Sequence, residues 1–489
     1  MSMISVQDLS FCYEGSYDTI FDHVSFRLDT DWKLGFIGRN GRGKTTFLKL
    51  LMGEYEYSGH IGASVSFQYF PFAVADKDGT AEQAADALCP GIPPWRLRRE
   101  LSEMEVEEDV LSRPFSMLSN GQQVKVLLSM LFLTENNFLL IDEPTNHLDL
   151  HGREVVSAYL KRKKGFILVS HDRAFLDGCV DHVLSINRAN IEVQEGNFSS
   201  WWQNKAYQDA FELGENEKRK REIERLSKAA RRTADWSDAV EKTKYHTQDV
   251  VDKGYIGHKS AKMMKRAQSI EARRQKAVEE KSKLLKNIET AESLKLRPLA
   301  HYREKLVEVS DLSLRYGEKT VVEGVSFSVS QGERIALQGK NGSGKTSILK
   351  LLMGSPIEHA GSVRLASGLS ISYVSQDTSF LNGGLAAYAR ESGIDESLFK
   401  AILRKLDFSR IQFEKDMRSF SEGQKKKVLI AKSLCEQAHL YIWDEPLNFV
   451  DVLSRIQIER LILEYRPTLL FVEHDKAFIA SVATGGVLL

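Results

Sequence analysis

The fold is decided by the stretch GRNGRGKTT, from Gly38 to Thr46, which recurs as GKNGSGKTS from Gly339 to Ser347. The second copy lies about 300 residues after the first, which marks an internal repeat. Each copy follows a short apolar run and precedes an apolar-periodic segment, so each predicts a strand, a glycine-rich turn and a helix. Such a turn presents backbone N–H groups to an anion. The pattern therefore predicts two phosphate-binding loops.

Three further motifs recur in the same order and at nearly the same spacing. They are LSNGQQ with Ser119 and FSEGQK with Ser421, FLLIDEP with Glu143 and LYIWDEP with Glu445, and VSHD with His171 and VEHD with His474. We predict that residues 1–201 and 303–489 are copies of one α/β domain, and that residues 202–302 form a linker between them.

Short apolar runs stand directly before the polar motifs, at residues 138–141, 166–169, 441–443 and 469–472. Runs of this length are typical of buried strands in a mostly parallel sheet. Ligands bind at the carboxyl ends of such strands. The carboxylates and histidines are therefore expected at the ligand-binding edge of each sheet.

The bulk composition is that of an ordinary globular protein. Among 489 residues, 42% are hydrophobic and 27% are charged, outside the disordered and fibrous ranges. No run of about 18 apolar residues or signal pattern is present, so we expect a cytoplasmic protein. The four cysteines have no spacing typical of zinc or of a disulfide framework, and buried reduced thiols are expected.

The motif residues suit phosphate and magnesium chemistry. The lysines that would hold the β- and γ-phosphates are Lys44 and Lys345. The predicted Mg²⁺ ligands or supports from these motifs are Thr45, Asp142, Thr346 and Asp444. The predicted catalytic residues are Glu143, Glu445, His171 and His474. Taken singly, a strand-end Asp-Glu pair could cap a helix and a histidine could be structural, but their repetition favours catalysis.

LSNGQQ and FSEGQK are similar to LSGGQ, the signature of the ATP-binding cassette superfamily. Both terminal domains therefore resemble that superfamily. The resemblance implies ATP and Mg²⁺ as cofactors and a head-to-tail pair in which each signature closes over the ATP of the other domain. It also implies that Asp149 and Asp451 communicate across the interface. The residues implied to contact ATP are Tyr13, Gly38, Asn40, Gly41, Gly43, Lys44, Thr45, Thr46, Ser421, Gly423 and Gln424 at one site, and Tyr316, Gly339, Asn341, Gly342, Gly344, Lys345, Thr346, Ser347, Gln376, Ser119, Gly121 and Gln122 at the other.

One position departs from the family pattern. The family's glutamine after the next strand, which the resemblance implies as a further Mg²⁺ ligand, is present as Gln376 in SYVSQ, but Phe72 occupies the matching place in QYFPF. We therefore expect the site built on Lys44 to hydrolyse ATP more slowly than the site built on Lys345.

The linker has its own composition. Residues 201–300 contain 24 Lys and Arg against 16 Asp and Glu, an excess that suits a nucleic-acid partner. Apolar residues at helical spacing predict an antiparallel coiled-coil hairpin with an arm on the order of 50 Å long and a turn over about residues 239–257. The residues predicted to contact RNA in this tip are Lys242, Lys244, Tyr245, His246, Lys253 and Tyr255. The basic stretch GHKSAKMMKRA follows from Gly257 to Ala267, and a solvated helix face is the alternative for that stretch.

The whole chain resembles the ABC-F family, in which two fused cassettes without membrane spans are joined by a long helical linker. TNHLD at Thr145 to Asp149 is typical of that family, and DEPLNFVD and GHKSAKMMKRA resemble its antibiotic-resistance subgroup of the Lsa and Vga kind. The resemblance implies a monomeric ATPase that binds the 70S ribosome, with 23S rRNA and P-site tRNA as contacts, and displaces lincosamide, streptogramin A or pleuromutilin drugs. It implies no DNA or membrane partner. A housekeeping ABC-F translation factor, a transporter ATPase subunit and a DNA-repair cassette protein remain alternatives.

Overall fold

The computed structural model describes residues 2–13, 19–74, 76–88, 90–134, 136–186, 191–246, 261–262, 264–266, 268–276, 294–317 and 319–489. These residues divide into two compact units. One unit contains both terminal domains, and the other contains helix α7 from Ser200 onward. The two units are therefore described separately.

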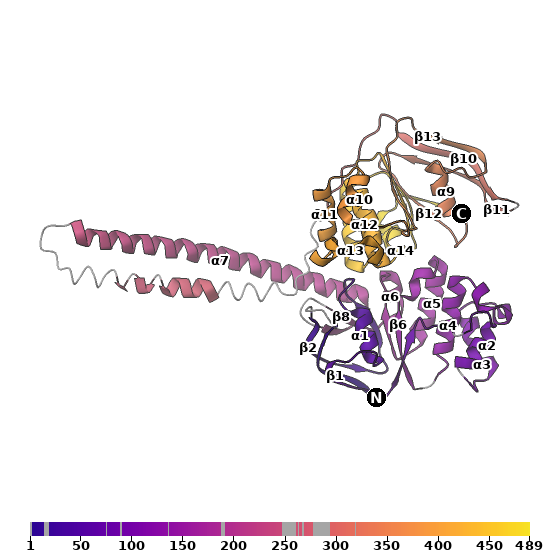
Figure 1. Ribbon diagram of the computed structural model, residues 1–489, viewed down its shortest axis with the longest axis horizontal. Helices are drawn as coiled ribbons and strands as arrows, with labels where there is room; N and C mark the ends of the chain where they lie inside the picture. Colours follow the sequence, from indigo (N-terminus) through magenta and orange to yellow (C-terminus); the bar gives the residue numbers. More distant parts are fainter. Residues whose placement is uncertain are drawn as a thin grey trace. The chain divides into compact units, whose positions relative to one another are not determined.

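The first domain has a six-stranded sheet in the order β5-β6-β7-β3-β8-β9, parallel except for β9, and an antiparallel sheet β2-β1-β4. Its strands are β1 Met3–Cys12, β2 Thr19–Asp29, β3 Lys33–Ile37, β4 Ser58–Gly62, β5 Ser66–Phe70, β6 Asn137–Asp142, β7 Phe166–Val169, β8 His182–Ile186 and β9 Ile191–Glu195. Its helices are α1 Lys44–Leu51, α2 Ala81–Leu88, α3 Pro94–Glu103, η1 Glu108–Ser112, η2 Phe115–Met117, α4 Asn120–Leu131, η3 Pro144–His147, α5 Leu150–Arg162 and α6 Arg173–Cys179. Figure 1 shows α2 and α3 at the opposite side of this domain from β1 and β2.

The second domain repeats this plan with a parallel sheet β14-β15-β16-β12-β17 and an antiparallel sheet β11-β10-β13. Its strands are β10 Lys305–Tyr316, β11 Lys319–Ser330, β12 Arg334–Gln338, β13 His359–Leu365, β14 Ile371–Val374, β15 Leu440–Asp444, β16 Leu469–Val472 and β17 Gly485–Leu488. Its helices are α9 Lys345–Leu352, α10 Leu385–Glu391, α11 Glu396–Lys405, η4 Arg410–Glu414, η5 Met417–Ser419, α12 Glu422–Cys435, α13 Val452–Tyr465 and α14 Lys476–Val482. The predicted fold of two tandem α/β domains is confirmed.

Buried apolar strands place the polar motifs at one edge of each sheet. All four residues of β7 and of β16 are buried, which is expected of central strands covered on both faces. In the first domain, β3, β6 and β7 are parallel neighbours. Their carboxyl ends therefore bring together the phosphate loop before α1, Asp142 and the segment that contains His171.

Both phosphate loops end in a glycine that no other residue could replace without strain. Gly43 and Gly344 have φ of 89°, in the left-handed region. A Cβ on Gly43 would lie 2.5 Å from the Ile20 side chain, and one on Gly344 would lie 2.3 Å from the Val322 side chain. The glycines thus allow the first helical turn to start tightly against the neighbouring strand.

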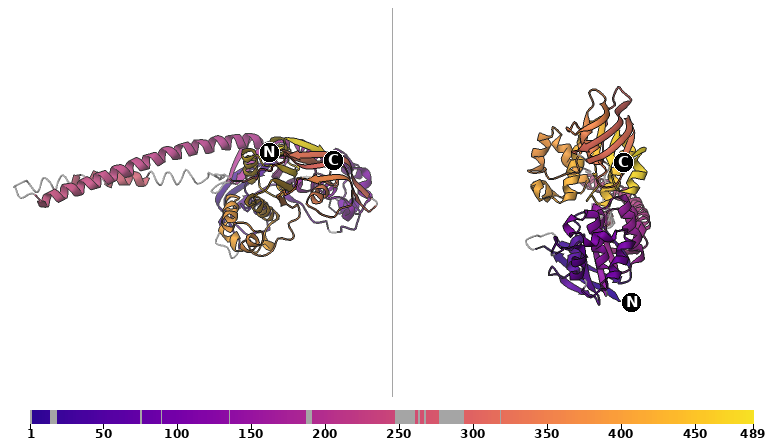
Figure 2. Two further views of the ribbon diagram at one scale, coloured as in Figure 1. Left: turned by 90° about the horizontal axis from the view of Figure 1, so that it is seen from above. Right: turned by 90° about the vertical axis from the view of Figure 1, so that its right-hand side faces the viewer.

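Helix α7 extends over Phe198–His246, 49 residues, or roughly 70 Å at the usual rise. The predicted turn begins too early, because residues 239–246 continue the helix. This segment, AVEKTKYH, contains neither glycine nor proline to end it. Lys242, Lys244, Tyr245 and His246 are therefore helical, while Lys253 and Tyr255 lie outside the described residues. The helical residues among 261–276 lie beside α7 in both views (Figures 1 and 2).

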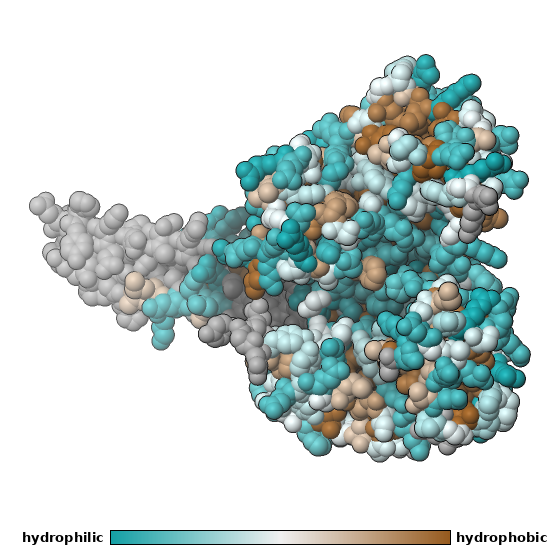
Figure 3. Space-filling model, turned by 45° about the vertical axis from the view of Figure 1, so that its right-hand side comes forward, coloured by the Kyte–Doolittle hydropathy of each residue, from teal (hydrophilic) through white to brown (hydrophobic). Residues whose placement is uncertain are grey.

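No helix among the described residues is both long and apolar enough to cross a bilayer. Hydrophilic residues cover most of the face of the terminal domains shown in Figure 3.

Candidate nucleotide sites between the two domains

The site built on Lys44 is a cavity of about 400 Å³ lined by both domains. The first domain contributes the phosphate loop, Asp142, Glu143 and His171, and the second contributes its signature loop with Ser421 and Gly423. The other predicted residues in the lining are Tyr13, Asn40, Gly41, Gly43, Thr45 and Thr46. The head-to-tail arrangement implied by the sequence is therefore present at this cavity.

The site built on Lys345 is a larger cavity of about 830 Å³, again lined by both domains. Predicted residues in its lining are Asn341, Gly342, Gly344, Thr346, Ser347, Gln376, Glu445 and His474 from the second domain, and Ser119, Gly121 and Gln122 from the first. Lys125 and Glu105 also line it and were not predicted. The two sites thus share a plan but differ in size.

Some predicted residues stand outside the two linings. The Gln424 side chain turns back, so that its Oε1 accepts a hydrogen bond from the Ser421 backbone N–H at 3.0 Å. The Tyr316 hydroxyl donates to Ser347 Oγ at 3.0 Å. Asp444 is fully buried beneath the cavity surface. Gly38 and Gly339 contribute carbonyl groups to the lysines instead.

Apolar residues that sequence reasoning missed stand at matched places in the two sites. Ile20 lines the first cavity and Val321 lines the second. Each lies in the strand that follows the predicted aromatic residue, Tyr13 or Tyr316. Their matched positions in the internal repeat were the available signal.

The phosphate-loop lysines fold back on their own loops. Lys44 Nζ donates to the carbonyls of Gly38 at 2.6 Å and Arg39 at 3.1 Å, and Lys345 Nζ makes the matching pair of bonds to residues 339 and 340 at 2.9 and 2.8 Å. Burial lowers the pKa of both lysines. An anionic phosphate would favour the charged form, so both sites suit a phosphate ligand.

The strand-end aspartates and the helix-start threonines supply oxygen ligands of the kind that Mg²⁺ prefers. Thr45 Oγ1 donates to Asp142 Oδ2 at 2.8 Å, and Thr346 Oγ1 donates to Asp444 Oδ1 at 3.2 Å. Asp444 Oδ2 is buried and has no hydrogen-bond partner in the described part of the chain. Burial raises the pKa of Asp444 to about 6. A nearby cation would stabilise its charged form, so these residues fit a magnesium ion.

Glu445 is surrounded by groups that stabilise a carboxylate. Gln376 Nε2 and Asn448 Nδ2 donate to its Oε2 at 2.9 and 2.6 Å, and His474 Nε2 lies 3.4 Å from its Oε1. Burial acts to raise the pKa of Glu445, but the interactions with His474 and Gln376 outweigh it and hold the pKa below its usual value. Glu445 is therefore ionised and ready to accept a proton from water.

Glu143 has a different environment. Neither of its carboxylate oxygens has a hydrogen-bond partner among the residues that the structure describes. His171 Nε2 lies 3.2 Å from Glu143 Oε1, but it is hydrogen-bonded to Asn40 Oδ1 at 3.0 Å. Burial, together with the charge of Asp142, raises the pKa of Glu143 to about 8. These effects disfavour the charged form of Glu143, whereas the contacts of Glu445 favour its charged form.

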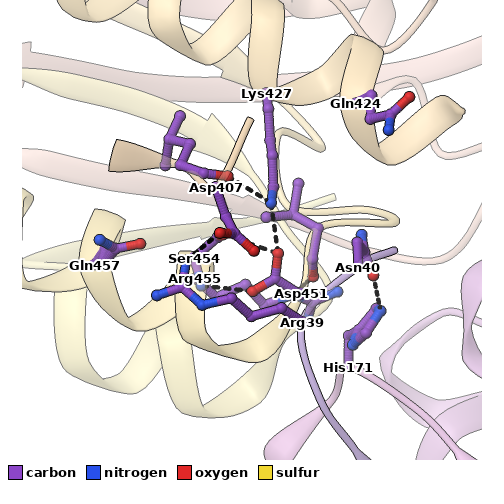
Figure 4. Close-up of polar contacts among 12 residues, drawn as sticks. Arg39, Asn40, His171, Asp407, Gln424, Lys427, Asp451, Ser454, Arg455 and Gln457 are labelled. Carbon is purple, nitrogen blue, oxygen red and sulfur yellow. Dashed lines mark hydrogen bonds and ion pairs between the residues drawn. The ribbon is translucent and has the colours of Figure 1, made fainter. Parts of the chain in front are cut away.

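The domains are joined at the Lys44 site through Asn40. Its Nδ2 donates to the carbonyl of Phe449 at 2.8 Å, while its Oδ1 contacts His171 (Figure 4). Phe449 has a φ of 63° and follows Glu445 in the second domain. One amide thus links the loop of the second domain to the histidine of the first.

A buried ion pair fixes the loop that presents Phe449. Lys427 Nζ lies 2.6 Å from Asp451 Oδ2, and both side chains are buried (Figure 4). Asp451 also accepts from Ser454 N at 2.9 Å and caps α13, while Arg455 Nε donates to the carbonyl of Val450 at 2.9 Å. The hydrogen bonds of Asp451 lie within its own domain, but its charge also acts on Lys44 and His171 of the first domain. The backbone of the loop makes the hydrogen bond across the interface.

The corresponding contact at the Lys345 site is weaker. Asn341 Nδ2 lies 3.5 Å from the carbonyl of His147. Asp149 caps α5 by accepting from Gly152 N at 2.8 Å and lines the larger cavity. Of the two equivalent amide contacts, the one at the site that contains Lys44 is therefore the shorter.

The signature glycines give a test of this difference. A Cβ on Gly423 would lie 2.3 Å from the Phe449 carbonyl oxygen and 2.9 Å from Asn40 Nδ2, whereas one on Gly121 would lie 3.4 Å from the His147 carbonyl oxygen. We expect Gly423→Ala to weaken ATP binding at the Lys44 site by about tenfold, because the loss of one or two hydrogen bonds costs on the order of 1.4 kcal/mol.

The Gly121→Ala variant is the matched control and is expected to bind ATP at the Lys345 site within about twofold of the unaltered protein. Both glycines stand at helix N-termini, where alanine is tolerated. Equilibrium binding of a non-hydrolysable ATP analogue to each variant measures the effect. Equal changes in the two variants would contradict the asymmetry.

The family model described as "ABC transporter" matches residues 21–146 and 322–448. The chain is 27% identical over 484 residues to "Ribosome protection protein VmlR" of Bacillus subtilis, covering 96% of this chain and 83% of that protein. It is 27% identical over 487 residues to "ATP-binding protein Uup" of Caulobacter vibrioides, covering 96% of this chain and 74% of that protein. The predicted resemblance to ABC-F proteins is confirmed.

Among solved structures, the chain resembles one from the crystal structure of the complex of archaeal ribosomal stalk protein aP1 and archaeal ribosome recycling factor aABCE1. The TM-score is 0.64 at 18% identity, over 98% of this chain and 87% of that chain. At this identity the similarity concerns the fold alone, which in both chains is a tandem arrangement of two domains.

Proposed function

Because the chain belongs to the ATP-binding cassette family and is an ATPase, we propose that it uses ATP to bind the ribosome and to protect it from antibiotics of the peptidyl-transferase centre. The drugs in question are lincosamides, streptogramin A compounds and pleuromutilins. The proposed partners are the 70S ribosome with its 23S rRNA and P-site tRNA, approached by a monomer in the cytoplasm without DNA or membrane.

The observation that carries this proposal is the similarity to the ribosome protection protein VmlR along nearly the whole chain. The alignment includes the linker as well as both domains, since it covers 96% of this chain. The basic excess of residues 201–300 agrees with an RNA partner. Shared motifs in the two domains alone would not distinguish this role from the other roles of the family.

ATP is the proposed source of the conformational change. When bound, ATP and magnesium would supply the negative and positive charges that the lysines and aspartates of the two sites complement. Each bound nucleotide would contact both domains, because residues of both line each cavity. Closure would therefore depend on ATP, and Glu445 would accept the proton of the attacking water when hydrolysis ends the closed state.

A short path of contacts leads from the Lys44 site to the first residues of α7. His171 is followed by Asp172, which caps α6 by accepting from Phe175 N at 3.0 Å. Asp177 lies later in α6. Its Oδ1 accepts a hydrogen bond at 2.7 Å from the backbone N–H of Ser199, which lies at the start of α7. A movement of the histidine segment would thus be passed to the first turn of the long helix.

Expression of the chain in a drug-susceptible strain tests the role. We expect the minimal inhibitory concentrations of lincosamides, streptogramin A and pleuromutilins to rise at least about fourfold, a shift of roughly 0.8 kcal/mol in effective drug binding. An antibiotic that acts on the cell wall serves as a control and should be unaffected. The double variant Glu143→Gln with Glu445→Gln should co-sediment with ribosomes in ATP.

The outcomes separate the alternatives. Co-sedimentation without any rise in drug resistance would favour a housekeeping translation factor. No co-sedimentation of the double variant would contradict a ribosomal role altogether.

A further inference from the structure

The two sites can be compared residue by residue because their strands pair in the same register. In the first domain Phe70 of β5 lies opposite Ile141 of β6, and in the second Val374 of β14 lies opposite Trp443 of β15. Residues 141 and 443 each precede the aspartate that ends the strand. Phe70 and Val374 are therefore equivalent positions.

Counting from these positions identifies two further equivalent pairs. Tyr69 corresponds to Tyr373, and Phe72 corresponds to Gln376. The second site thus has both a tyrosine and an amide near its acidic residues, while the first has the tyrosine but not the amide. In the first domain, Tyr69 is therefore the polar residue of this segment that contacts Asp142.

The contacts of the two aspartates differ accordingly. Tyr69 Oη donates to Asp142 Oδ2 at 2.9 Å, and Thr45 Oγ1 donates to the same oxygen at 2.8 Å. In the second domain Thr346 Oγ1 donates to Asp444 Oδ1, and the Oδ2 atom has no hydrogen-bond partner in the described structure. Tyr373 therefore does not hold Asp444 as Tyr69 holds Asp142.

We propose that Tyr69 is a positioning residue for magnesium at the Lys44 site, where its hydroxyl fixes the carboxylate of Asp142 and compensates for the amide that Phe72 lacks. The inference deepens the ATP-binding part of the proposed function, on which it rests. It does not depend on binding to the ribosome. A hydrogen bond to a carboxylate fixes the orientation in which the carboxylate meets a cation. Removing such outer contacts typically weakens metal binding by about 10- to 100-fold.

The test compares Tyr69→Phe with its matched control Tyr373→Phe, each of which removes one hydroxyl and keeps the ring. Tyr69→Phe is made in a Lys345→Ala background, and Tyr373→Phe in a Lys44→Ala background, so that one site is followed at a time. Binding of a radiolabelled non-hydrolysable ATP analogue is measured over a range of Mg²⁺ concentrations and in a chelator, without ribosomes.

We expect Tyr69→Phe to raise the half-saturating Mg²⁺ concentration about tenfold and to leave binding in chelator unchanged, whereas Tyr373→Phe changes the Mg²⁺ requirement less than about twofold. A merely structural tyrosine would weaken binding equally with and without Mg²⁺, and that result would overturn the proposal. An unchanged Mg²⁺ requirement in Tyr69→Phe, or equal increases in both variants, would also overturn it. None of these results bears on whether the chain binds ribosomes.

Discussion

ATP turnover is expected to fall at least about 100-fold in the Glu445→Gln variant, but no more than about threefold in the Glu143→Gln variant. A positioned general base contributes about 100- to 10,000-fold to a rate. That contribution disappears only where the glutamate acts as a base in the unaltered protein. We expect Glu445 to act as such a base and Glu143 to do so only weakly.

Glu445 is both ionised and oriented. Two amides, from Gln376 and Asn448, donate to one of its oxygens, and His474 lies near the other. These contacts keep its pKa low although burial opposes them. Replacement by glutamine keeps the shape of the side chain but removes the charge that would take a proton.

Glu143 lacks this support. Phe72 offers no amide at the place of Gln376, and His171 bonds to Asn40. Burial raises the pKa of Glu143 and so disfavours the charged form that a general base needs. The Lys44 site would then retain ATP while the Lys345 site turns it over.

Steady-state phosphate release from the two single variants is the measurement, with thermal unfolding as a control for folding. Equal losses of turnover in both variants would contradict the assignment, as would a larger loss in Glu143→Gln.

The sequence predicted the fold well because the deciding features are local. The glycine-rich turns, the apolar strands and the polar residues that follow them each occupy a few consecutive positions, and their repetition fixed the two-domain plan. The end of α7 was predicted too early because aromatic and basic residues suggested a turn. Without glycine or proline at residues 239–246, nothing stops the helix there.

The contacts between the domains could not be predicted in this way. Asn40 meets the carbonyl of Phe449 across 409 positions of sequence, and the contact depends on a left-handed backbone that a phenylalanine rarely adopts. Likewise, Lys427 is an unremarkable lysine of a basic run in the sequence, and its burial against Asp451 follows from tertiary packing. The different lengths of the two equivalent amide contacts also depend on tertiary packing.

Replacement of both Ser119 and Ser421 by arginine is expected to reduce ATP turnover to below about 1% of that of the unaltered protein. Catalysis needs charge stabilisation and positioning, which together contribute several kcal/mol. Ser119 lines the cavity of Lys345, and Ser421 lines the cavity of Lys44. An arginine side chain would occupy the space between signature and phosphate loop. Each domain would still bind ATP on its own loop but could not close over it.

The serines also cap α4 and α12 by accepting from Gln122 N and Gln424 N, and loss of such a cap costs about 1 kcal/mol of stability. The double alanine variant controls for this, since it removes both caps without filling the cavities. We expect it to keep a larger share of turnover than the arginine variant at similar thermal stability.

ATP turnover of the purified Ser119→Arg, Ser421→Arg protein is therefore the most direct test of whether both sites are completed across the two domains. Turnover below about 1%, with folding and nucleotide binding retained, is the predicted result, corresponding to a barrier raised by at least about 2.7 kcal/mol. Turnover equal to that of the unaltered protein would mean that each domain hydrolyses ATP alone.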